Sequence, residues 1–282
     1  MGDTGLCQRG GGLCRAKRAG GFTLPEVLVS LAVVAILIAI LLPSLGAVRM
    51  TAQQVFCSSN VRQTGLALSI YTDDYDRALP PSWVWDLGMV TQGSTYTSSD
   101  TNVLRVDQLN GRSRETRGRL GYGEEGWDGL GILSSQDYLD PYNVFYCPSH
   151  PEHLSPEAFE EAWRSGQGEI RGNYQYRGTG PDGERVLSLV DPASSALVLD
   201  TLRIQDDLNH ERGINVLLAD LSVRWFDAAS TGVLDGVPSR LSNVSRSLSG
   251  RGVTSGQAVQ LVSVDSLRMW AGVDEIAAEV SR

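Results

Sequence analysis

Cysteine and histidine side chains gather in one short stretch of the sequence. Cys147, His150 and His153 follow one another with two residues between neighbours. Thiolate sulfur and imidazole nitrogen are ligands that Zn²⁺ prefers, and the spacing is short enough for a turn. Two prolines stiffen the stretch, however, and a fourth ligand such as His210 or Cys57 would have to fold back from far away. We therefore predict that no metal binds here and that these histidines lie at the surface.

A second pattern pairs a histidine with an aspartate ten residues later. His210 and Asp220 are the residue types of a general base and the acid that orients it. Catalysis by such a pair needs further groups, and we find no nucleophile elbow, zincin helix or phosphate-binding loop in the sequence. We expect His210 to pack or to form a hydrogen bond across a hairpin. The sequence therefore predicts a protein that is not an enzyme and that has no cofactor.

Two further patterns are weak indications of a ligand. Asp73, Asp74 and Asp76 offer the carboxylate oxygens that Ca²⁺ prefers, but such a run more often caps a helix end. The glycines of 121–126 match the text of a dinucleotide-binding loop. They follow no predicted strand and enclose two glutamates that would repel a pyrophosphate, so we interpret them as an ordinary loop.

The overall composition excludes several classes of protein. The chain has 282 residues, of which 41% are hydrophobic and 20% charged, so it can build a packed core and is not disordered throughout. Lys and Arg number 24 against 33 Asp and Glu, which gives a net charge of -9. An acidic chain lacks the basic surface of a nucleic-acid-binding protein, so we expect no nucleic-acid partner.

The N-terminal segment differs from the rest of the chain. Residues 1–21 are rich in glycine and carry one acid, Asp3, against four basic residues, which is typical of a flexible leader. Residues 27–48 carry no charge and would span ~33 Å as a helix at about 1.5 Å per residue. The hydrocarbon core of a bilayer is roughly 30 Å thick. Because basic flanks stay in the cytoplasm, the sequence predicts one membrane crossing with the C-terminal part outside.

Two residues are unusual for an ordinary membrane anchor. Glu26 lies at the edge of the apolar run, and a carboxylate deeper in a membrane costs about 2.5–3.5 kcal/mol unless it has a partner. Pro43 lies inside the run, where we expect it to kink or end the helix.

The junction between leader and apolar run resembles a known processing motif. The residues Gly21-Phe22-Thr23-Leu24-Pro25-Glu26 are similar to the cleavage site of type IV pilins and type II secretion pseudopilins. The resemblance implies that a prepilin peptidase cleaves between Gly21 and Phe22 and methylates the new amino group of Phe22. It also implies that Glu26 neutralises that ammonium group on a neighbouring subunit.

Two other interpretations of the N-terminal segment remain open. One is a conventional signal peptide that is cut after Gly46, although the apolar run is longer than the usual 7–15 residues. The other is a signal anchor that is never cut.

The later sequence carries a second, weaker resemblance. Many pilin-like proteins contain a histidine, nine residues and then Asp-Gly, and here His210 is followed by nine residues and Asp220. Leu221 replaces the glycine. A leucine in a left-handed conformation costs about 1–2 kcal/mol, so we expect the turn to differ from that of the family. The two resemblances together cover roughly 22–226.

Four cysteines are present in the sequence. Cys7 and Cys14 would leave with the leader, which leaves Cys57 and Cys147 as one pair in an oxidising compartment. A disulfide between them would stabilise the domain by ~4–5 kcal/mol in the chain-entropy model. The alternative is two separate buried thiols.

The spacing of apolar residues predicts a small number of helices and strands. We expect one helix from Thr23 to about Tyr71, and a short helix over 155–165 with Ser155 as its N-cap. Strands are predicted over 195–200, 214–218 and 223–226, the last two as a hairpin, with a further strand at 258–264 and a helix at 274–280. The predicted fold is α+β and pilin-like, with the long helix packed on a small antiparallel sheet.

The domain organisation follows from these elements. We expect a cleaved leader over 1–21, a transmembrane assembly helix over 22–48, an extracytoplasmic domain over 49–230 and an extension of unknown role over 231–282. The resemblance implies a pseudopilin or minor pilin of a type II secretion or type IV pilus-like system, held in the inner membrane and incorporated in a filament. Its partners would be prepilin peptidase and other pilin-like subunits. The alternative is an anchored extracytoplasmic binding module that does not polymerise.

Overall fold

The computed structural model describes residues 22–82, 102–105, 126–140, 142–150, 155–165, 170–182, 184–200, 209–210, 212–233 and 270–281. The chain divides into two compact units, Met1–Val48 and Arg49–Arg282. Several predictions fall outside the described residues: the leader up to Gly21, most of the glycine loop over 121–126, His153 and the strand at 258–264.

Helix α1 (Leu24–Asp74) is the longest element and belongs to both units. It continues through Pro43, as the predicted single helix requires, so of the two effects expected of this proline, a kink or an end of the helix, the end does not occur. The helix ends where Asp76 and Arg77 take positive φ angles of 50° and 64°. This agrees with the predicted end near Tyr71, ahead of the two prolines at 80 and 81.

The rest of the second unit is built from short strands and helices. Strands β3 (Tyr174–Tyr176), β4 (Ala196–Asp200), β5 (Gly213–Leu218) and β6 (Val223–Asp227) form one antiparallel sheet in that order. Strands β1 (Val103–Arg105) and β2 (Ile170–Arg171) form a second antiparallel pair. The helical elements are α4 (Gly131–Ser135), η2 (Tyr142–Phe145), α5 (Pro156–Ser165), η3 (Leu187–Leu189), α6 (Ala228–Thr231) and a helix over 270–280. The α+β prediction is confirmed.

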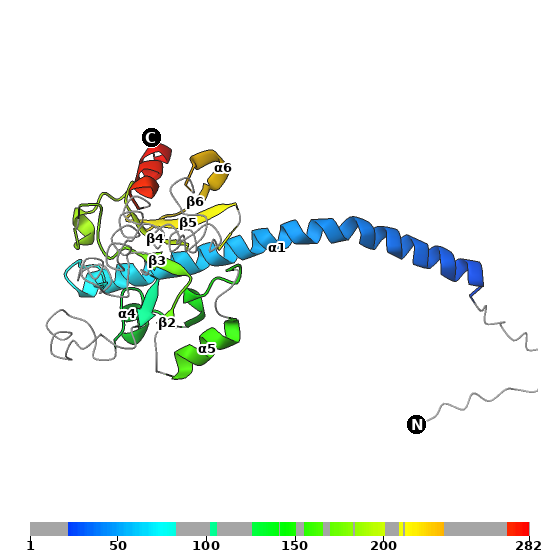
Figure 1. The fold of residues 1–282 in the computed structure, drawn as a ribbon, viewed down its shortest axis with the longest axis horizontal. Coiled ribbons are helices and arrows are strands. Elements are labelled where there is room, and N and C mark those ends of the chain that lie inside the picture. Colours follow the sequence, from blue (N-terminus) through cyan, green and yellow to red (C-terminus); the bar gives the residue numbers. More distant parts are fainter. Residues whose placement is uncertain are drawn as a thin grey trace, which may run out of the picture. The chain divides into compact units, whose positions relative to one another are not determined.

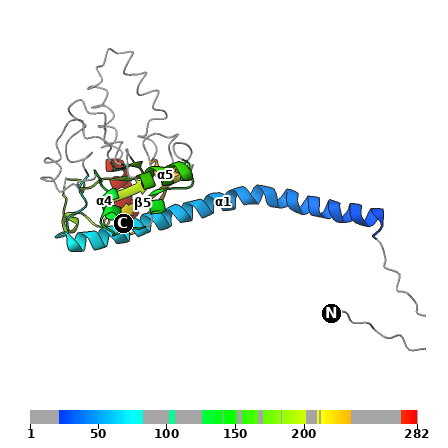
Figure 2. The same cartoon turned by 90° about the horizontal axis from the view of Figure 1, so that it is seen from below.

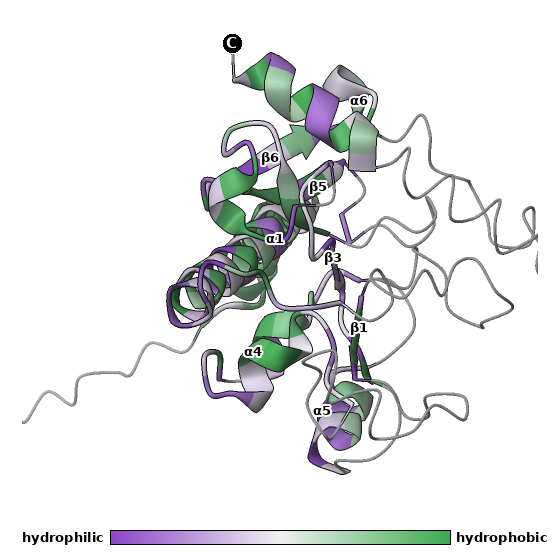
Figure 3. Ribbon diagram, turned by 90° about the vertical axis from the view of Figure 1, so that its left-hand side faces the viewer, coloured by the Kyte–Doolittle hydropathy of each residue, from purple (hydrophilic) through white to green (hydrophobic). Residues whose placement is uncertain are grey.

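The four-stranded sheet is apolar on both faces and lies between α1 and the C-terminal helix (Figures 1 and 3). On β5, Ile214, Val216 and Leu218 pack in one cluster with the C-terminal helix, whereas Leu217 packs in the cluster that contains α1. This alternation is the period of two that a strand imposes on its side chains. The sheet is therefore the middle layer of the second unit.

The C-terminal half of α1 packs closely on this sheet and on the elements around α4 and α5 (Figure 2). Cys57, Val61 and Leu68 are fully buried on its inner face. At Gly65 a Cβ atom would lie 2.8 Å from a methyl carbon of Leu217. The missing side chain thus allows the helix to approach the strand.

The helix over 270–280 is part of the folded domain. Trp270, Val273 and Ala277 are buried against the sheet. The Asp274 carboxylate accepts a hydrogen bond from the Ala196 backbone N–H at 2.8 Å and pairs with the Arg177 guanidinium at 2.6 Å. The predicted C-terminal helix is confirmed, and its position gives residues 270–281 a structural role.

The other local predictions agree with the structure. The N-cap of α5 is Ser155, whose Oγ accepts a hydrogen bond from the Ala158 backbone N–H at 3.2 Å. The strands predicted over 195–200, 214–218 and 223–226 correspond to β4, β5 and β6. Strand β3, at the edge of the sheet, was not predicted.

Candidate functional site

The start of α1 is held by a contact between two residues of the processing motif. Thr23 precedes the first helical residue, and its backbone N–H and hydroxyl both donate to Glu26 Oε2 at 3.2 Å. A glutamate that reaches back to the N-cap residue is half of a capping box, and its negative charge is favourable at the positive end of the helix dipole. The Glu26 carboxylate is therefore stabilised by its own helix, one turn from Phe22.

The first unit presents an apolar helix without a covering layer. Among the described residues, one helix is long and apolar enough to cross a membrane, over Leu24–Leu42 with a mean hydropathy of 2.7. None of that stretch is buried. Phe22 is also exposed, so the amino group that cleavage would create there is accessible.

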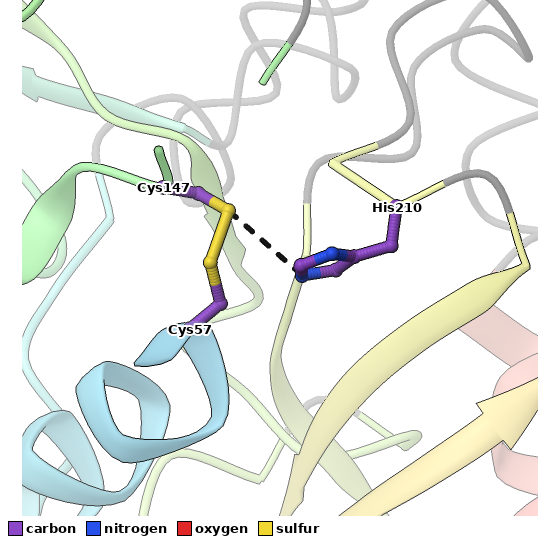
Figure 4. A group of neighbouring side chains, drawn as sticks. All are labelled: Cys57, Cys147 and His210. Atoms are coloured by element: carbon purple, nitrogen blue, oxygen red, sulfur yellow. Dashed lines mark hydrogen bonds between the residues drawn. A yellow bond between two sulfur atoms is a disulfide. The ribbon is translucent and has the colours of Figure 1, made fainter. Parts of the chain in front are cut away.

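In the second unit, the structure joins Cys57 and Cys147 by a disulfide (Figure 4). Their Cα atoms lie 5.6 Å apart, within the range that a disulfide requires. Cys57 comes from the inner face of α1, and Cys147 from the segment after η2. Both side chains are fully buried, so the bond ties the long helix to the core of the domain.

His210 points at this disulfide from the segment before β5 (Figure 4). Its Nε2 lies 3.9 Å from Cys147 Sγ and 3.7 Å from Asp200 Oδ2. The ring also makes an edge-on contact with Trp225 of β6, with centroids 5.7 Å apart. We call Cys57, Cys147, His210 and Asp200 the disulfide–histidine cluster.

Asp200 is the polar centre of this cluster and is fully buried at the end of β4. Its Oδ2 accepts hydrogen bonds from the backbone N–H of Asn215 at 2.7 Å and from the side-chain amide of Asn215 at 3.0 Å, and its Oδ1 accepts one from Asn209 at 3.2 Å. Burial raises the pKa of Asp200 to about 7, although these hydrogen bonds oppose the shift. Burial also lowers the pKa of His210 to about 4. Both side chains are therefore neutral in the window between about pH 4 and pH 7.

Asp220 lies elsewhere, at the exposed turn between β5 and β6. Its Oδ1 accepts a hydrogen bond from the Ser222 backbone N–H at 2.8 Å, and the Leu221 N–H donates to the Leu218 carbonyl at 2.9 Å. Leu221 itself has φ of 64°, the left-handed conformation for which hairpins use glycine. Leu221 adopts this strained conformation, and the paired strands and the Asp220 carboxylate hold the turn.

Leu221→Gly should raise the free energy of unfolding by about 1 kcal/mol. A left-handed leucine costs about 1–2 kcal/mol, and the entropy that glycine loses on folding offsets about 0.5–1 kcal/mol of that gain. Urea unfolding followed by tryptophan fluorescence measures the difference. Leu221→Ala is the matched control, because alanine removes the side chain but keeps the left-handed strain; an equal gain in both variants would contradict the explanation.

Three of the remaining candidate residues, His150, Asp73 and Asp74, take part in ordinary protein contacts. His150 Nδ1 lies 2.9 Å from Asn209 Oδ1. Asp73 pairs with Arg77 at 2.9 Å, and Asp74 accepts a hydrogen bond from the Tyr138 hydroxyl at 2.8 Å. In the ranges that the structure describes, the one group with metal-ligand spacing is Cys57, Cys147 and His210.

The sequence did not predict Asp200 of the disulfide–histidine cluster or the two asparagines that bind it. Asp200, Asn209 and Asn215 carry the hydrogen-bond network, with Asn209 also donating to the Asn173 carbonyl at 2.7 Å. The sequence offered one weak indication of this network, because polar residues stand within predicted buried strands and next to His210. Buried polar side chains are nearly always hydrogen-bonded, so these residues could have been expected to bind one another.

Comparison with known proteins identifies the N-terminal segment. Residues 16–42 match the family model described as the prokaryotic N-terminal methylation motif. No curated protein and no solved structure matches the chain. The match shows a prepilin-type methylation motif on an apolar N-terminal helix, which indicates a type IV pilin-like protein that prepilin peptidase processes and that the helix anchors in a membrane.

Proposed function

We propose that this protein is a structural pilin-like subunit, a pseudopilin or minor pilin of a type II secretion or type IV pilus-like system. It is cleaved between Gly21 and Phe22 and methylated at Phe22. The methylation motif over residues 16–42, which leads directly into the apolar part of α1, carries the proposal. In this function the chain scaffolds an assembly, and the domain performs no catalysis.

The charge distribution of the N-terminal segment supports a single orientation in the inner membrane. The leader carries four basic residues against one acidic residue, so its side of the helix stays in the cytoplasm. The domain from Arg49 onward is then extracytoplasmic, and in Gram-negative cells periplasmic. The disulfide between Cys57 and Cys147 suits that oxidising compartment.

Glu26 gives the assembly its register. Within one subunit, its carboxylate accepts hydrogen bonds from the backbone N–H and the hydroxyl of Thr23 at the same helix end. Cleavage creates an ammonium group at Phe22, and methylation leaves that group positively charged. In the low dielectric of a membrane, the carboxylate of one subunit and the ammonium of its neighbour attract strongly, because both lie beside an apolar run where isolated charges are costly. Subunits therefore bind in the one axial position that pairs these charges.

Glu26→Ala should leave membrane insertion and cleavage intact but abolish assembly, since the neighbouring ammonium loses its partner. Photo-cross-linking through residues 22–45 in membranes measures assembly, and the N-terminal mass, starting at methylated Phe22, reports processing. Glu26→Gln is the matched variant, because an amide oxygen can keep the contact with Thr23 without the charge.

Normal cross-linked oligomers of the glutamine variant would contradict charge pairing. A monomer in the unaltered protein would favour an anchored binding module, and a chain that begins at Met1 or after Gly46 would refute the processing.

A further inference from the structure

We propose that Cys57, Cys147 and His210 bind one zinc ion when the two cysteines are in the dithiol form. The two Sγ atoms and the imidazole nitrogen lie within 4.8 Å of one another. Around a tetrahedral zinc ion, with ligand bonds of about 2.0–2.3 Å, neighbouring sulfur and nitrogen ligands lie roughly 3.5–3.8 Å apart. The observed distance from Cys147 Sγ to His210 Nε2 is 3.9 Å, close to that edge length.

The three ligands come from distant segments that the fold already holds in place. Cys57 lies on α1, Cys147 follows η2 and His210 precedes β5. The Cys147 backbone N–H donates to Asn173 Oδ1 at 3.0 Å, and Asn209, beside His210, donates to the Asn173 carbonyl at 2.7 Å. Such hydrogen bonds around a metal site fix the ligands before the ion binds. Cys147 and the residue before His210 are thus both tied to Asn173 by contacts that do not depend on the disulfide.

The chemistry of the donor set favours zinc. Two thiolates and one imidazole are the ligands of zinc sites with three protein donors, which leave a fourth position for water. The two cysteine side chains are fully buried, and the His210 side chain is 8% exposed, so the ion would be shielded from bulk solvent.

Zinc binding and the disulfide exclude each other, because both use the same two sulfur atoms. A dithiol reductant breaks the S–S bond by giving two electrons and two protons, which yields two thiols and the oxidised reductant. Zinc then displaces the two thiol protons to water and keeps its own oxidation state. In the disulfide state one bond links α1 to the segment after η2, and in the dithiol state the zinc ion would link both to the segment before β5. A chain made in the reducing cytoplasm passes through the dithiol form before the export that the proposed function requires.

The test uses the full chain in detergent micelles with Cys7→Ser and Cys14→Ser, so that the only cysteines are Cys57 and Cys147. The protein is reduced with a phosphine, which competes little for the metal, and is titrated with Co²⁺ without oxygen. We expect one Co²⁺ per chain, with the charge-transfer band of a cobalt thiolate and the visible bands of a tetrahedral ion, and displacement of Co²⁺ by Zn²⁺. The oxidised chain should show none of these bands.

Two variants separate a built site from thiols that bind metal by themselves. His210→Gln should weaken Co²⁺ binding by at least about tenfold and change the visible bands. His150 contacts Asn209 but is not one of the three proposed ligands, so His150→Gln should leave the affinity for Co²⁺ unchanged. An unchanged affinity of His210→Gln for Co²⁺ would overturn the proposal. A reduced chain that binds no Co²⁺ when one equivalent is added would also overturn it, whether circular dichroism shows that chain to be folded or unfolded. None of these outcomes depends on processing or assembly.

Discussion

Replacing Cys57 and Cys147 together by alanine should lower the free energy of unfolding of the domain by ~4–5 kcal/mol. The disulfide joins residues 90 positions apart. In the chain-entropy model, closing a loop of this length removes that much conformational freedom from the unfolded chain. The free energy of unfolding of most domains is only about 5–15 kcal/mol, so the variant would be close to unfolding.

Urea unfolding of the full chain in detergent micelles, followed by tryptophan fluorescence, measures this effect. All six tryptophans follow residue 48, so their emission reports on the second unit. The same double substitution at Cys7 and Cys14 is the control, because these residues belong to the first unit and not to the domain. A loss of less than about 1 kcal/mol at Cys57 and Cys147 would mean that the bond does not constrain the unfolded chain, contrary to the entropic account.

The sequence predicts best what short stretches determine by themselves. The processing motif over residues 21–26 and the apolar run after it are contiguous, so residue types and spacing were sufficient to recognise them. The same holds for α5, where Ser155 caps the helix, and for the β5–β6 hairpin. In each case the decisive interactions join residues within a few positions.

Leu221 shows that the intrinsic preference of one residue does not decide its conformation. Its intrinsic preference argues against a left-handed turn, yet its φ is 64°. Five paired positions between β5 and β6 fix the register of the hairpin, and Asp220 caps the turn from its own side chain. The pairing energy of the strands is gained only with this turn, so it exceeds the strain of a single residue.

The disulfide–histidine cluster depended on contacts that no local pattern contains. Cys147 and His150 suggested a local metal motif, but His150 contacts Asn209 instead. His210 meets Cys147 across 63 residues of sequence. Such contacts follow from the way α1 packs on the sheet. Periodicity in the sequence predicts the helix and the strands, but it does not predict which residues of the helix lie against which residues of the sheet.

The stability of the unaltered domain should change little between about pH 4 and pH 6.5 as far as Asp200 and His210 are concerned. In the unfolded chain at these pH values the aspartate is ionised and the histidine protonated, with ordinary pKa values of 3.8 and 6.5. In the folded chain the proton is on Asp200, whose pKa is raised to about 7, and His210 is neutral, because its pKa is lowered to about 4. The folded and the unfolded chain therefore each bind one proton on Asp200 and His210 together. Because the two counts are equal, this pair does not make the free energy of unfolding depend on pH.

Replacing either Asp200 or His210 alone should make the free energy of unfolding depend on pH, with opposite signs in the two variants. In His210→Gln only the raised pKa of Asp200 remains; the folded state then keeps a proton that the unfolded state releases, so stability falls as the pH rises from about 4 to about 7. In Asp200→Asn only the lowered pKa of His210 remains; the unfolded state then binds the extra proton, so stability falls as the pH drops from about 6.5 to about 4. The slope approaches about 1.4 kcal/mol per pH unit in each case.

Urea unfolding of the three proteins at intervals between pH 4 and pH 7 tests these signs. Other groups with shifted pKa values, such as Asp274, whose pKa burial raises, and Glu157, whose pKa hydrogen bonds lower, contribute equally to all three and cancel in the differences from the unaltered protein. Slopes of the same sign in the two variants, or no slope in either, would contradict the raised pKa of Asp200 and the lowered pKa of His210.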